Sequence, residues 1–269
     1  QAMINASGTQ QVWVAKGTYK PATDVSGNAS PADPRMKTFQ MKAGVKIYGG
    51  FKGDETDLLQ RTFTVMANNK SILSGDLNGD DATTGNGENS YHVVYNVGNG
   101  LTTDNSLLDG FTITAGNANS YTIIDGHASG VTHGIGGGMQ NANFSSPSIV
   151  NCIFSKNQAN FSGGGMDNHV ASPNLVNCTF TENHAKDGAI GGGMHNYACS
   201  PSLVNCNFLG NLASDGGGMY NYGSGTSLVN CSFLGNLAST HGGGVRNEGK
   251  DSQPPSFVNC IFSGNQAES

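Results

Sequence analysis

The segment "SGGGMDNHVASPNLVNCTFTEN" runs from Ser162 to Asn183 and combines a glycine triplet, a Val-Asn-Cys triplet and a Phe-x-x-Asn motif. Variants of this segment recur through the second half of the chain at a spacing of about 26 residues, which is typical of solenoid proteins. The glycine triplets begin at Gly136, Gly163, Gly191, Gly216 and Gly242. The second half of the chain is therefore an array of structural repeats.

Each repeat carries three asparagines, one cysteine and one phenylalanine at matching positions. The asparagines that follow the glycine triplets are Asn141, Asn168, Asn196, Asn221 and Asn247. The asparagines of the Val-Asn-Cys triplets are Asn151, Asn177, Asn205, Asn230 and Asn259. The asparagines of the Phe-x-x-Asn motifs are Asn157, Asn183, Asn211, Asn236 and Asn265. The cysteines are Cys152, Cys178, Cys206, Cys231 and Cys260, and the phenylalanines are Phe154, Phe180, Phe208, Phe233 and Phe262.

The repeat predicts an all-β fold. Its segments are short, glycine-rich and β-branched, and turns of Asn, Gly and Ser separate them, which favours strands over helices. Three short strands per repeat of about 26 residues predict one coil of a right-handed parallel β-helix, in which equivalent positions stack ~4.8 Å apart. Each asparagine amide can then donate to one neighbouring coil and accept from the other, while the phenylalanines form an apolar column inside.

One position of the repeat varies freely. It lies between the Met or Val that follows each glycine triplet and the next asparagine. It holds Gln140, Asp167, His195, Tyr220 and Arg246. Such variety predicts side chains that point outward into solvent.

The first half of the chain is less regular but has the same texture of short β-rich runs and turns. We expect residues 1–130 to form four or five irregular coils with long loops, and residues 131–269 to form five regular coils of one continuous solenoid. The segment between Pro21 and Pro34 is polar and is expected to project from the body. The last repeat lacks a visible cap, which predicts that further coils or another copy of the chain pack against it.

The motifs resemble two groups of known proteins. "GGGM" paired with Phe-x-x-Asn is similar to the repeats of the polymorphic outer-membrane protein family, which are surface adhesins built on a β-helix. "VWVAKGTY", "IYGGFKGDET" and "DGFTIT" resemble segments of secreted bacterial right-handed β-helix proteins, the pectate-lyase-like proteins among them. The resemblance implies a β-helix at a bacterial cell surface or outside the cell.

The cysteines and one acidic segment suggest further chemistry. Five of the six cysteines occupy equivalent positions, and stacked side chains fit disulfide geometry poorly, so a ladder of free thiols is expected rather than disulfides. Cys199 lies outside the series in a predicted loop, where it can be exposed and form a cross-link. "SGDLNGDD" places Asp76, Asn78, Asp80 and Asp81 together, with Glu88 nearby, and oxygen ligands of this kind suit calcium. The alternative is a solvated turn, with no cofactor.

A catalytic site is not expected. The seven histidines share no repeat position and are interpreted as scattered surface residues. The acidic residues of the regular coils occupy different repeat positions, so stacking gives no carboxylate cluster of the kind that a glycoside hydrolase needs. Tyr197, Tyr220 and Tyr222 lie in neighbouring coils and can form a small strip that stacks on sugars.

The sequence therefore favours an extracellular structural or adhesive rod that is not an enzyme. The alternative is a module that binds or cleaves polysaccharide. The net charge of −6 and the lack of a basic run argue against nucleic acid as a partner, and no apolar stretch is long enough for a membrane helix. The expected partners are other copies or further coils, a host surface, or polysaccharide.

Overall fold

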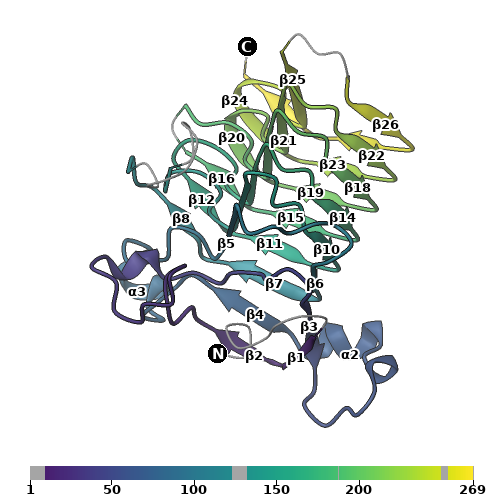
Figure 1. Ribbon diagram of the computed structural model, residues 1–269. Coiled ribbons are helices and arrows are strands. Elements are labelled where there is room, and N and C mark those ends of the chain that lie inside the picture. The colour runs from purple at the N-terminus through teal and green to yellow at the C-terminus, as the bar shows by residue number, and fades with distance from the viewer. Residues whose placement is uncertain (1–9, 123–131, 187, 250–253, 269) are drawn as a thin grey trace.

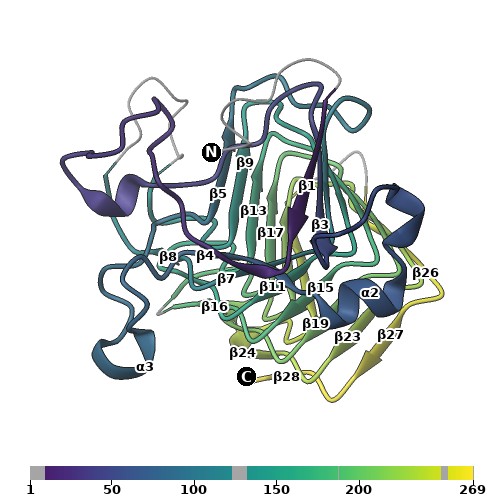
Figure 2. The same ribbon diagram turned by 90° about the horizontal axis from the view of Figure 1, so that it is seen from below.

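The computed structural model describes residues 10–122, 132–186, 188–249 and 254–268. The strands of this part of the chain form four sheets in which each strand pairs in parallel with the equivalent strand of the next coil. Figure 1 shows the coils stacked from the N-terminal end to the C-terminal end, and Figure 2 looks along the stack. The predicted parallel β-helix solenoid is confirmed.

Sheets A and B have eight strands each. Sheet A contains β1 (Gln11–Ala15), β3 (Lys46–Phe51), β6 (Leu107–Asp109), β10 (Ser148–Val150), β14 (Asn174–Val176), β18 (Ser202–Val204), β22 (Ser227–Val229) and β26 (Ser256–Val258). Sheet B contains β2 (Gly17–Tyr19), β4 (Ser71–Ser74), β7 (Phe111–Thr114), β11 (Ile153–Ser155), β15 (Thr179–Thr181), β19 (Asn207–Leu209), β23 (Ser232–Leu234) and β27 (Ile261–Ser263).

Sheets C and D have six strands each. Sheet C contains β5 (Val94–Val97), β9 (Met139–Ala142), β13 (Met166–His169), β17 (Met194–Tyr197), β21 (Met219–Tyr222) and β25 (Val245–Glu248). Sheet D contains β8 (Asn117–Ala118), β12 (Gln158–Ala159), β16 (His184–Ala185), β20 (Leu212–Asp215), β24 (Leu237–His241) and β28 (Gln266–Ala267).

A regular coil thus has four strands, not the three expected from the sequence. The reason is that each coil turns four corners through the left-handed region of the backbone. In the coil that begins with β13, these corners are Val170, Asn177, Glu182 and Gly191, with φ of 52°, 54°, 53° and 66°. A left-handed backbone costs roughly 1–2 kcal/mol for residues other than glycine and asparagine, so valine and glutamate give no sequence signal for a corner.

Sheets A and B run without interruption through both halves of the described chain. Among the described residues, three strands of sheet A, namely β1, β3 and β6, precede the five strands of the regular coils, so three irregular coils are seen there where four or five were expected. The expected boundary near residue 130 lies outside the described residues. The irregular coils carry long loops with η1 (Pro34–Met36), η2 (Leu58–Gln60), α2 (Phe63–Asn68) and α3 (Asp81–Thr84). Helices α2 and α3 lie on opposite sides of the N-terminal end (Figures 1 and 2).

The core is built from columns of identical side chains. The phenylalanine rings of the repeat stack with centroids 4.6–4.9 Å apart and nearly parallel planes, and four of the five are fully buried. The Met residues of sheet C and the Leu or Ile residues of sheet A fill the rest of the interior.

The asparagines form three ladders of side-chain hydrogen bonds. The amide groups of two ladders donate in one direction along the stack, and those of the third donate in the other. In two buried ladders each amide Nδ2 donates toward the C-terminal end, as from Asn168 to Asn196 and from Asn183 to Asn211. In the exposed ladder Nδ2 donates toward the N-terminal end, as from Asn177 to Asn151. This outer ladder ends on Asp109, whose carboxylate forms a buried ion pair with Arg61.

The glycine triplets are required because the coil is tightest where sheet D leads into sheet C. The first glycine has positive φ, as at Gly191, which reverses the chain direction. A Cβ on Gly193 would lie 2.5 Å from the Gly218 carbonyl oxygen and 2.9 Å from the Phe208 ring. Any side chain here would push the Phe column and the next coil apart.

All six cysteines are free thiols. Each thiol of the ladder donates to backbone carbonyls, and only Cys260 is partly exposed. Burial raises the pKa of Cys152 to about 12. The prediction that Cys199 is exposed is wrong: its side chain is buried, and its Sγ lies 3.6 Å from the Asn168 carbonyl oxygen. Burial raises its pKa to about 12 as well, so it is unsuited to cross-linking.

Thiol labelling checks this arrangement. We expect a thiol reagent at pH 8 to modify Cys260 rapidly in the native protein and the other cysteines only after unfolding, because a buried, protonated thiol is a poor nucleophile. Peptide mass spectrometry after timed labelling with N-ethylmaleimide identifies each modified residue. Early labelling of Cys199 or Cys206 would contradict the buried ladder.

Candidate functional site

The variable position of the repeat is not solvated as expected: it is buried from Gln140 to Tyr220, and only Arg246 is partly exposed. We call the column of register partners Tyr95, Gln140, Asp167, His195, Tyr220 and Arg246 the polar seam. Asp167 is 0% exposed and His195 is 6% exposed. These side chains leave sheet C on its outer face, but the glycine reversal folds the preceding segment back over them. Ser162, for example, donates to Asp167 Oδ2 at 2.7 Å.

The C-terminal half of the seam is held by ion pairs and hydrogen bonds, most of them between different coils. His195 Nδ1 lies 2.7 Å from Asp167 Oδ2, and the Tyr220 hydroxyl donates to Glu248. Burial raises the pKa of Tyr220 to about 12. Arg246 pairs with Asp215 at 2.8 Å and with Glu248 at 3.1 Å. Asp215 and Glu248, which occupy different repeat positions, therefore share Arg246 as an ion-pair partner.

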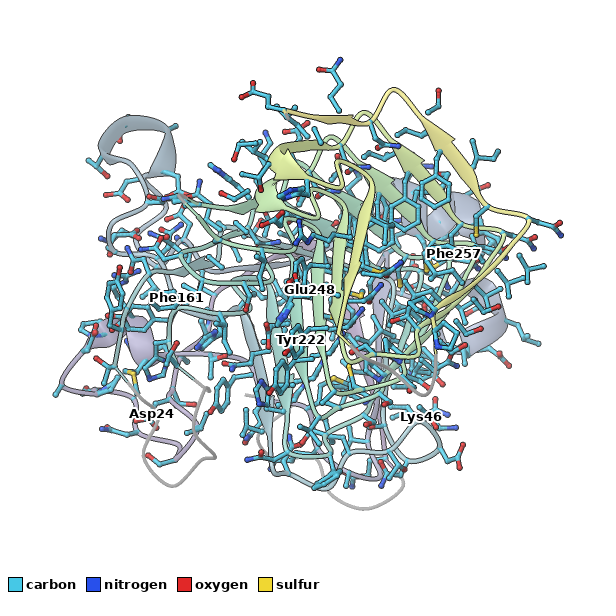
Figure 3. All side chains as sticks on the ribbon, turned by 90° about the horizontal axis from the view of Figure 1, so that it is seen from above. Asp24, Lys46, Phe161, Tyr222, Glu248 and Phe257 are labelled. Carbon is cyan, nitrogen blue, oxygen red and sulfur yellow. The ribbon has the colours of Figure 1, made fainter. Side chains whose placement is uncertain are left out.

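The charged cluster around Asp215 is the solvent-facing end of the seam. Asp215 Oδ1 accepts from Thr240, His241 and Arg246. Partial burial opposes ionisation, but the hydrogen bonds from Thr240 and His241 lower the pKa of Asp215. Figure 3 shows Glu248 and Tyr222 on this face, away from Phe257 at the edge of the last coil. All three acceptor interactions of Asp215 are internal, so the carboxylate acts as a structural partner.

The Asp167–His195 pair cannot act on a polymer in this structure. A catalytic group must come within hydrogen-bonding reach of the substrate atoms, either directly or through one water. Asp167 is completely buried, and the exposed fraction of the His195 side chain is only 8%. The seam therefore stabilises the packing of coils on one another and does not form an open cleft for a sugar chain.

A pair of buried histidines lies at the N-terminal end of the seam. The interpretation of the histidines as scattered surface residues is wrong for His195 of the seam and for His92 and His133, which are 3% and 7% exposed. His92 Nε2 lies 3.0 Å from His133 Nδ1, and His92 Nδ1 donates to the Gly136 carbonyl oxygen at 3.1 Å. The ring of His133 stacks on Tyr91, whose hydroxyl donates to Asp33. The two histidines come from segments without a shared repeat position, so no sequence signal indicated this contact.

The histidine pair makes stability depend on pH. Burial lowers the pKa of His92 to about 3 and that of His133 to about 4, so both are neutral in the folded protein at neutral pH. Because the folded pKa values lie below the unfolded value of about 6.5, this stability is present above pH 6.5 and is lost as the pH falls toward 4. Each histidine then destabilises the fold by about 2–3 kcal/mol at pH 4.5.

Denaturant unfolding between pH 7.5 and pH 4.5 measures this effect. His92→Gln keeps a donor for the Gly136 carbonyl and removes one titrating group, so the variant should lose less stability on acidification than the parent chain. His241→Gln is the control, because the side chain of His241 is 70% exposed. Equal acid slopes for the parent chain and His92→Gln would show that the pair does not titrate as stated.

The proposed tyrosine strip has a different composition from the one expected. Tyr197 and Tyr222 are exposed and stack on each other at 5.5 Å, and His169 extends the stack at 4.5 Å from Tyr197. Tyr220 does not belong to the strip, because it is buried in the seam. The faces of the inner rings are covered by their neighbours, so a sugar ring can stack only at the end of the column.

The acidic loop brings together a different set of residues from the one expected. One carboxylate oxygen from each of Asp76, Asp80 and Glu88 lies within 4.8 Å of the others. The side chain of Asp81 instead accepts from Asn89, and Asn78 offers its backbone N–H to Glu88. Burial and the neighbouring carboxylates of Asp80 and Asp76 raise the pKa of Glu88. These three residues are the ones that could hold a hard divalent cation such as calcium.

Calcium binding at this loop has a simple stability readout. We expect millimolar calcium to raise the melting temperature by several degrees, because a ligand present at about 100 times its Kd stabilises the folded state by about 2.7 kcal/mol. Glu88→Gln should abolish the calcium effect and also stabilise the calcium-free protein by relieving repulsion. Glu182→Gln is the control, because the side chain of Glu182 is 63% exposed on a regular coil. If calcium does not shift the melting temperature of the parent chain, the loop does not bind calcium and is only a solvated turn.

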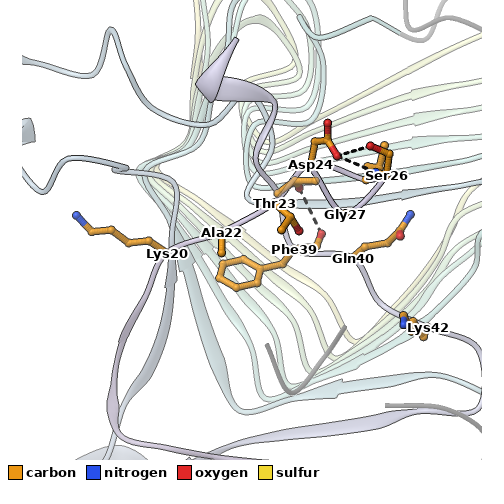
Figure 4. Close-up of a pocket in the computed structure, with 11 residues that line it drawn as sticks. Lys20, Ala22, Thr23, Asp24, Ser26, Gly27, Phe39, Gln40 and Lys42 are labelled. Carbon is orange, nitrogen blue, oxygen red and sulfur yellow. Dashed lines mark hydrogen bonds between the residues drawn. The ribbon is translucent and has the colours of Figure 1, made fainter. Parts of the chain in front are cut away.

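A pocket of about 260 Å³ lies beneath the loop that was expected to project from the body. It is lined by Lys20, Ala22, Thr23, Asp24, Val25, Ser26, Gly27, Thr38, Phe39, Gln40 and Lys42. Backbone bonds fix Phe39 to Val93 and Tyr95. Asp24 Oδ1 accepts from Ser26 and Asn28, which holds the loop in a defined turn. In the view of Figure 4, Lys20 and Lys42 lie at opposite ends of the pocket, with Phe39 between them.

The comparisons with known proteins assign no family to this chain. No family model, no curated protein and no solved structure matches it. The resemblance to adhesin and pectate-lyase-like β-helix proteins thus stays a prediction from the motifs. Among the described residues, no helix has the length and apolar character needed to cross a membrane.

Proposed function

We propose that the protein is an extracellular structural or adhesive rod that contacts its partner through the loop formed by residues 20–42. The observation that carries the proposal is the contrast between the two halves of the chain. In the regular coils the three asparagine ladders, the phenylalanine column and the polar seam are occupied by contacts within the chain. Three pockets, of about 260, 430 and 530 Å³, are lined in part by the 20–42 loop.

The chemistry of this loop suits a polar partner that carries negative charge. Lys20 and Lys42 supply ammonium groups and Gln40 supplies an amide in the lining of one pocket, beside the single carboxylate of Asp24. A neighbouring pocket adds Lys37 to the same flank, whereas the guanidinium of Arg35 in that pocket donates to the Asn89 and Asn117 carbonyl oxygens. A host surface or an acidic polysaccharide offers the carboxylates and hydroxyls that these groups recognise.

A binding array tests the proposal. The labelled chain is applied to immobilised glycans and extracellular-matrix proteins, and the double variant Lys20→Glu/Lys42→Glu should bind at least tenfold more weakly. Lys156→Glu is the matched control, because Lys156 is exposed on a regular coil. Equal binding by the parent chain and the double variant would refute the role of the loop. Unsaturated product from an acidic polysaccharide would instead establish cleavage.

The proposal extends to the edge of the last described coil. Phe257, Val258, Ile261 and Phe262 are 38–61% exposed there, whereas the equivalent Leu228 and Phe233 one coil earlier are fully buried. A coil from a second copy, or a further coil of a longer chain, would cover this apolar edge. Sedimentation of this chain should show association that depends on concentration and that Ile261→Lys weakens. A strictly monomeric particle would argue against contact between copies.

A further inference from the structure

The N-terminal half of the polar seam contains four buried polar atoms that lack a partner. These atoms are the Tyr95 hydroxyl, both atoms of the Gln140 amide, and Asp167 Oδ1. The three residues are 4%, 0% and 0% exposed. They are also consecutive register partners on β5, β9 and β13, so the four atoms belong to one continuous stretch of the seam. Native proteins rarely leave buried polar atoms unpaired, so such a cluster indicates that something is bound there.

Direct bonds between these side chains do not explain the cluster. Tyr95 could donate to the Gln140 oxygen, and the Gln140 nitrogen could donate to Asp167, because neighbouring strands lie ~4.8 Å apart. Among the described residues, however, none of the four atoms has a partner within 3.5 Å. Polar groups that face each other across more than about 3.5 Å are commonly bridged by water.

We propose that ordered water molecules bind in the seam between Tyr95, Gln140 and Asp167. The donor and acceptor inventory selects water over a metal ion. The Gln140 nitrogen needs an acceptor, whereas the Gln140 oxygen and Asp167 Oδ1 need donors. A cation satisfies only the oxygens, but water both donates and accepts, and a buried water typically makes about three hydrogen bonds.

The surroundings of the seam are consistent with a narrow space for water. The turns beside the seam are formed by glycine: a Cβ on Gly136 would lie 2.9 Å from Gln140 Cβ, and one on Gly163 would lie 2.8 Å from Asp167 Cβ. Farther along, Asp167 Oδ2 and His195 bond directly, so bound water is confined to the first three positions.

A crystal structure at high resolution tests the proposal directly. We expect density for at least one water at hydrogen-bonding distance, ~2.7–3.2 Å, from both Gln140 and Asp167. Direct contact between the Gln140 amide and Asp167 Oδ1, or a seam without density, would overturn it.

A variant provides a second, independent test. Gln140→Met keeps the length of the side chain and removes both polar atoms. If water is bound, the variant removes the hydrogen bonds between this water and residue 140, and the melting temperature should fall by several degrees. If the Gln140 amide is dry and unpaired, the same change should raise the melting temperature. Gln266→Met, at an exposed position of β28, controls for the change of residue type and should leave the melting temperature nearly unchanged.

Discussion

The Phe180→Ala variant is expected to lose about 3–5 kcal/mol of unfolding free energy. The ring of Phe180 is fully buried between Phe154 and Phe208, with centroids 4.7 and 4.8 Å away. Its removal leaves a cavity at the centre of the column and takes a stacking contact from both neighbours. Because a solenoid is stabilised mainly by contacts between adjacent coils, the loss should concentrate in the coils on either side.

Denaturant unfolding and hydrogen exchange together measure this loss. Phe262→Ala is the matched control in the same column, because its ring is 48% exposed and has only Phe233 as a stacked neighbour among the described repeat phenylalanines. The control should lose roughly 1–2 kcal/mol, since less apolar surface leaves the core. Equal losses of unfolding free energy for Phe180→Ala and Phe262→Ala would mean that burial in the phenylalanine column does not contribute to stability as stated.

The Asn183→Ala variant is expected to lose about 3–5 kcal/mol, although it deletes only a small polar group. Asn183 Oδ1 accepts from the backbone N–H and the side-chain amide of Asn157, while its Nδ2 donates to the Phe154 carbonyl and to Asn211. Alanine leaves all four partner groups without this side chain in a buried place. An unpaired buried polar group costs about 1–3 kcal/mol, so the partners left behind dominate the effect.

The control for this variant is Asn177→Gly in the exposed ladder of the same coil. Glycine keeps the left-handed corner at φ 54°, so the variant removes only the amide, whose partners can bond to water instead. Its loss should stay near 1 kcal/mol or below. Urea unfolding of both variants gives the comparison. If Asn177→Gly lowers the unfolding free energy as much as Asn183→Ala does, then burial does not explain the contribution of the inner ladder to stability.

The sequence was sufficient to predict the features that repeat. Equal spacing of Asn, Phe and Cys implies stacking, because only stacked coils bring equivalent positions together. The number of strands per coil was not predictable, since corners at Val170 and Glu182 use residues that rarely adopt a left-handed backbone. The burial of the seam was not predictable either. Alternation along a strand shows which side chains point outward, but not that another segment, such as the one with Ser162, covers them.

The parts of the site that do not repeat were the least predictable. The His92–His133 pair and the Asp76–Asp80–Glu88 cluster depend on the paths of long loops, for which periodicity gives no distances. Cys199 was assigned to an exposed loop on the basis of its neighbours, yet its segment packs against the Asn168 carbonyl. For the His92–His133 pair and for Cys199, a contact between segments distant in the sequence decides the environment of the residue.

The asparagine ladders and the polar seam differ in how well they tolerate the duplication of a coil during evolution. An asparagine ladder accepts any coil that brings the same amide, so a whole coil could be copied or deleted without breaking the pattern. The Asp167–His195 pair instead ties two particular coils together, and a coil inserted between them would separate a buried carboxylate from its partner. A coil inserted after β21 would likewise separate Tyr220 from Glu248 and Arg246 from Asp215, so the seam opposes changes in rod length at both places.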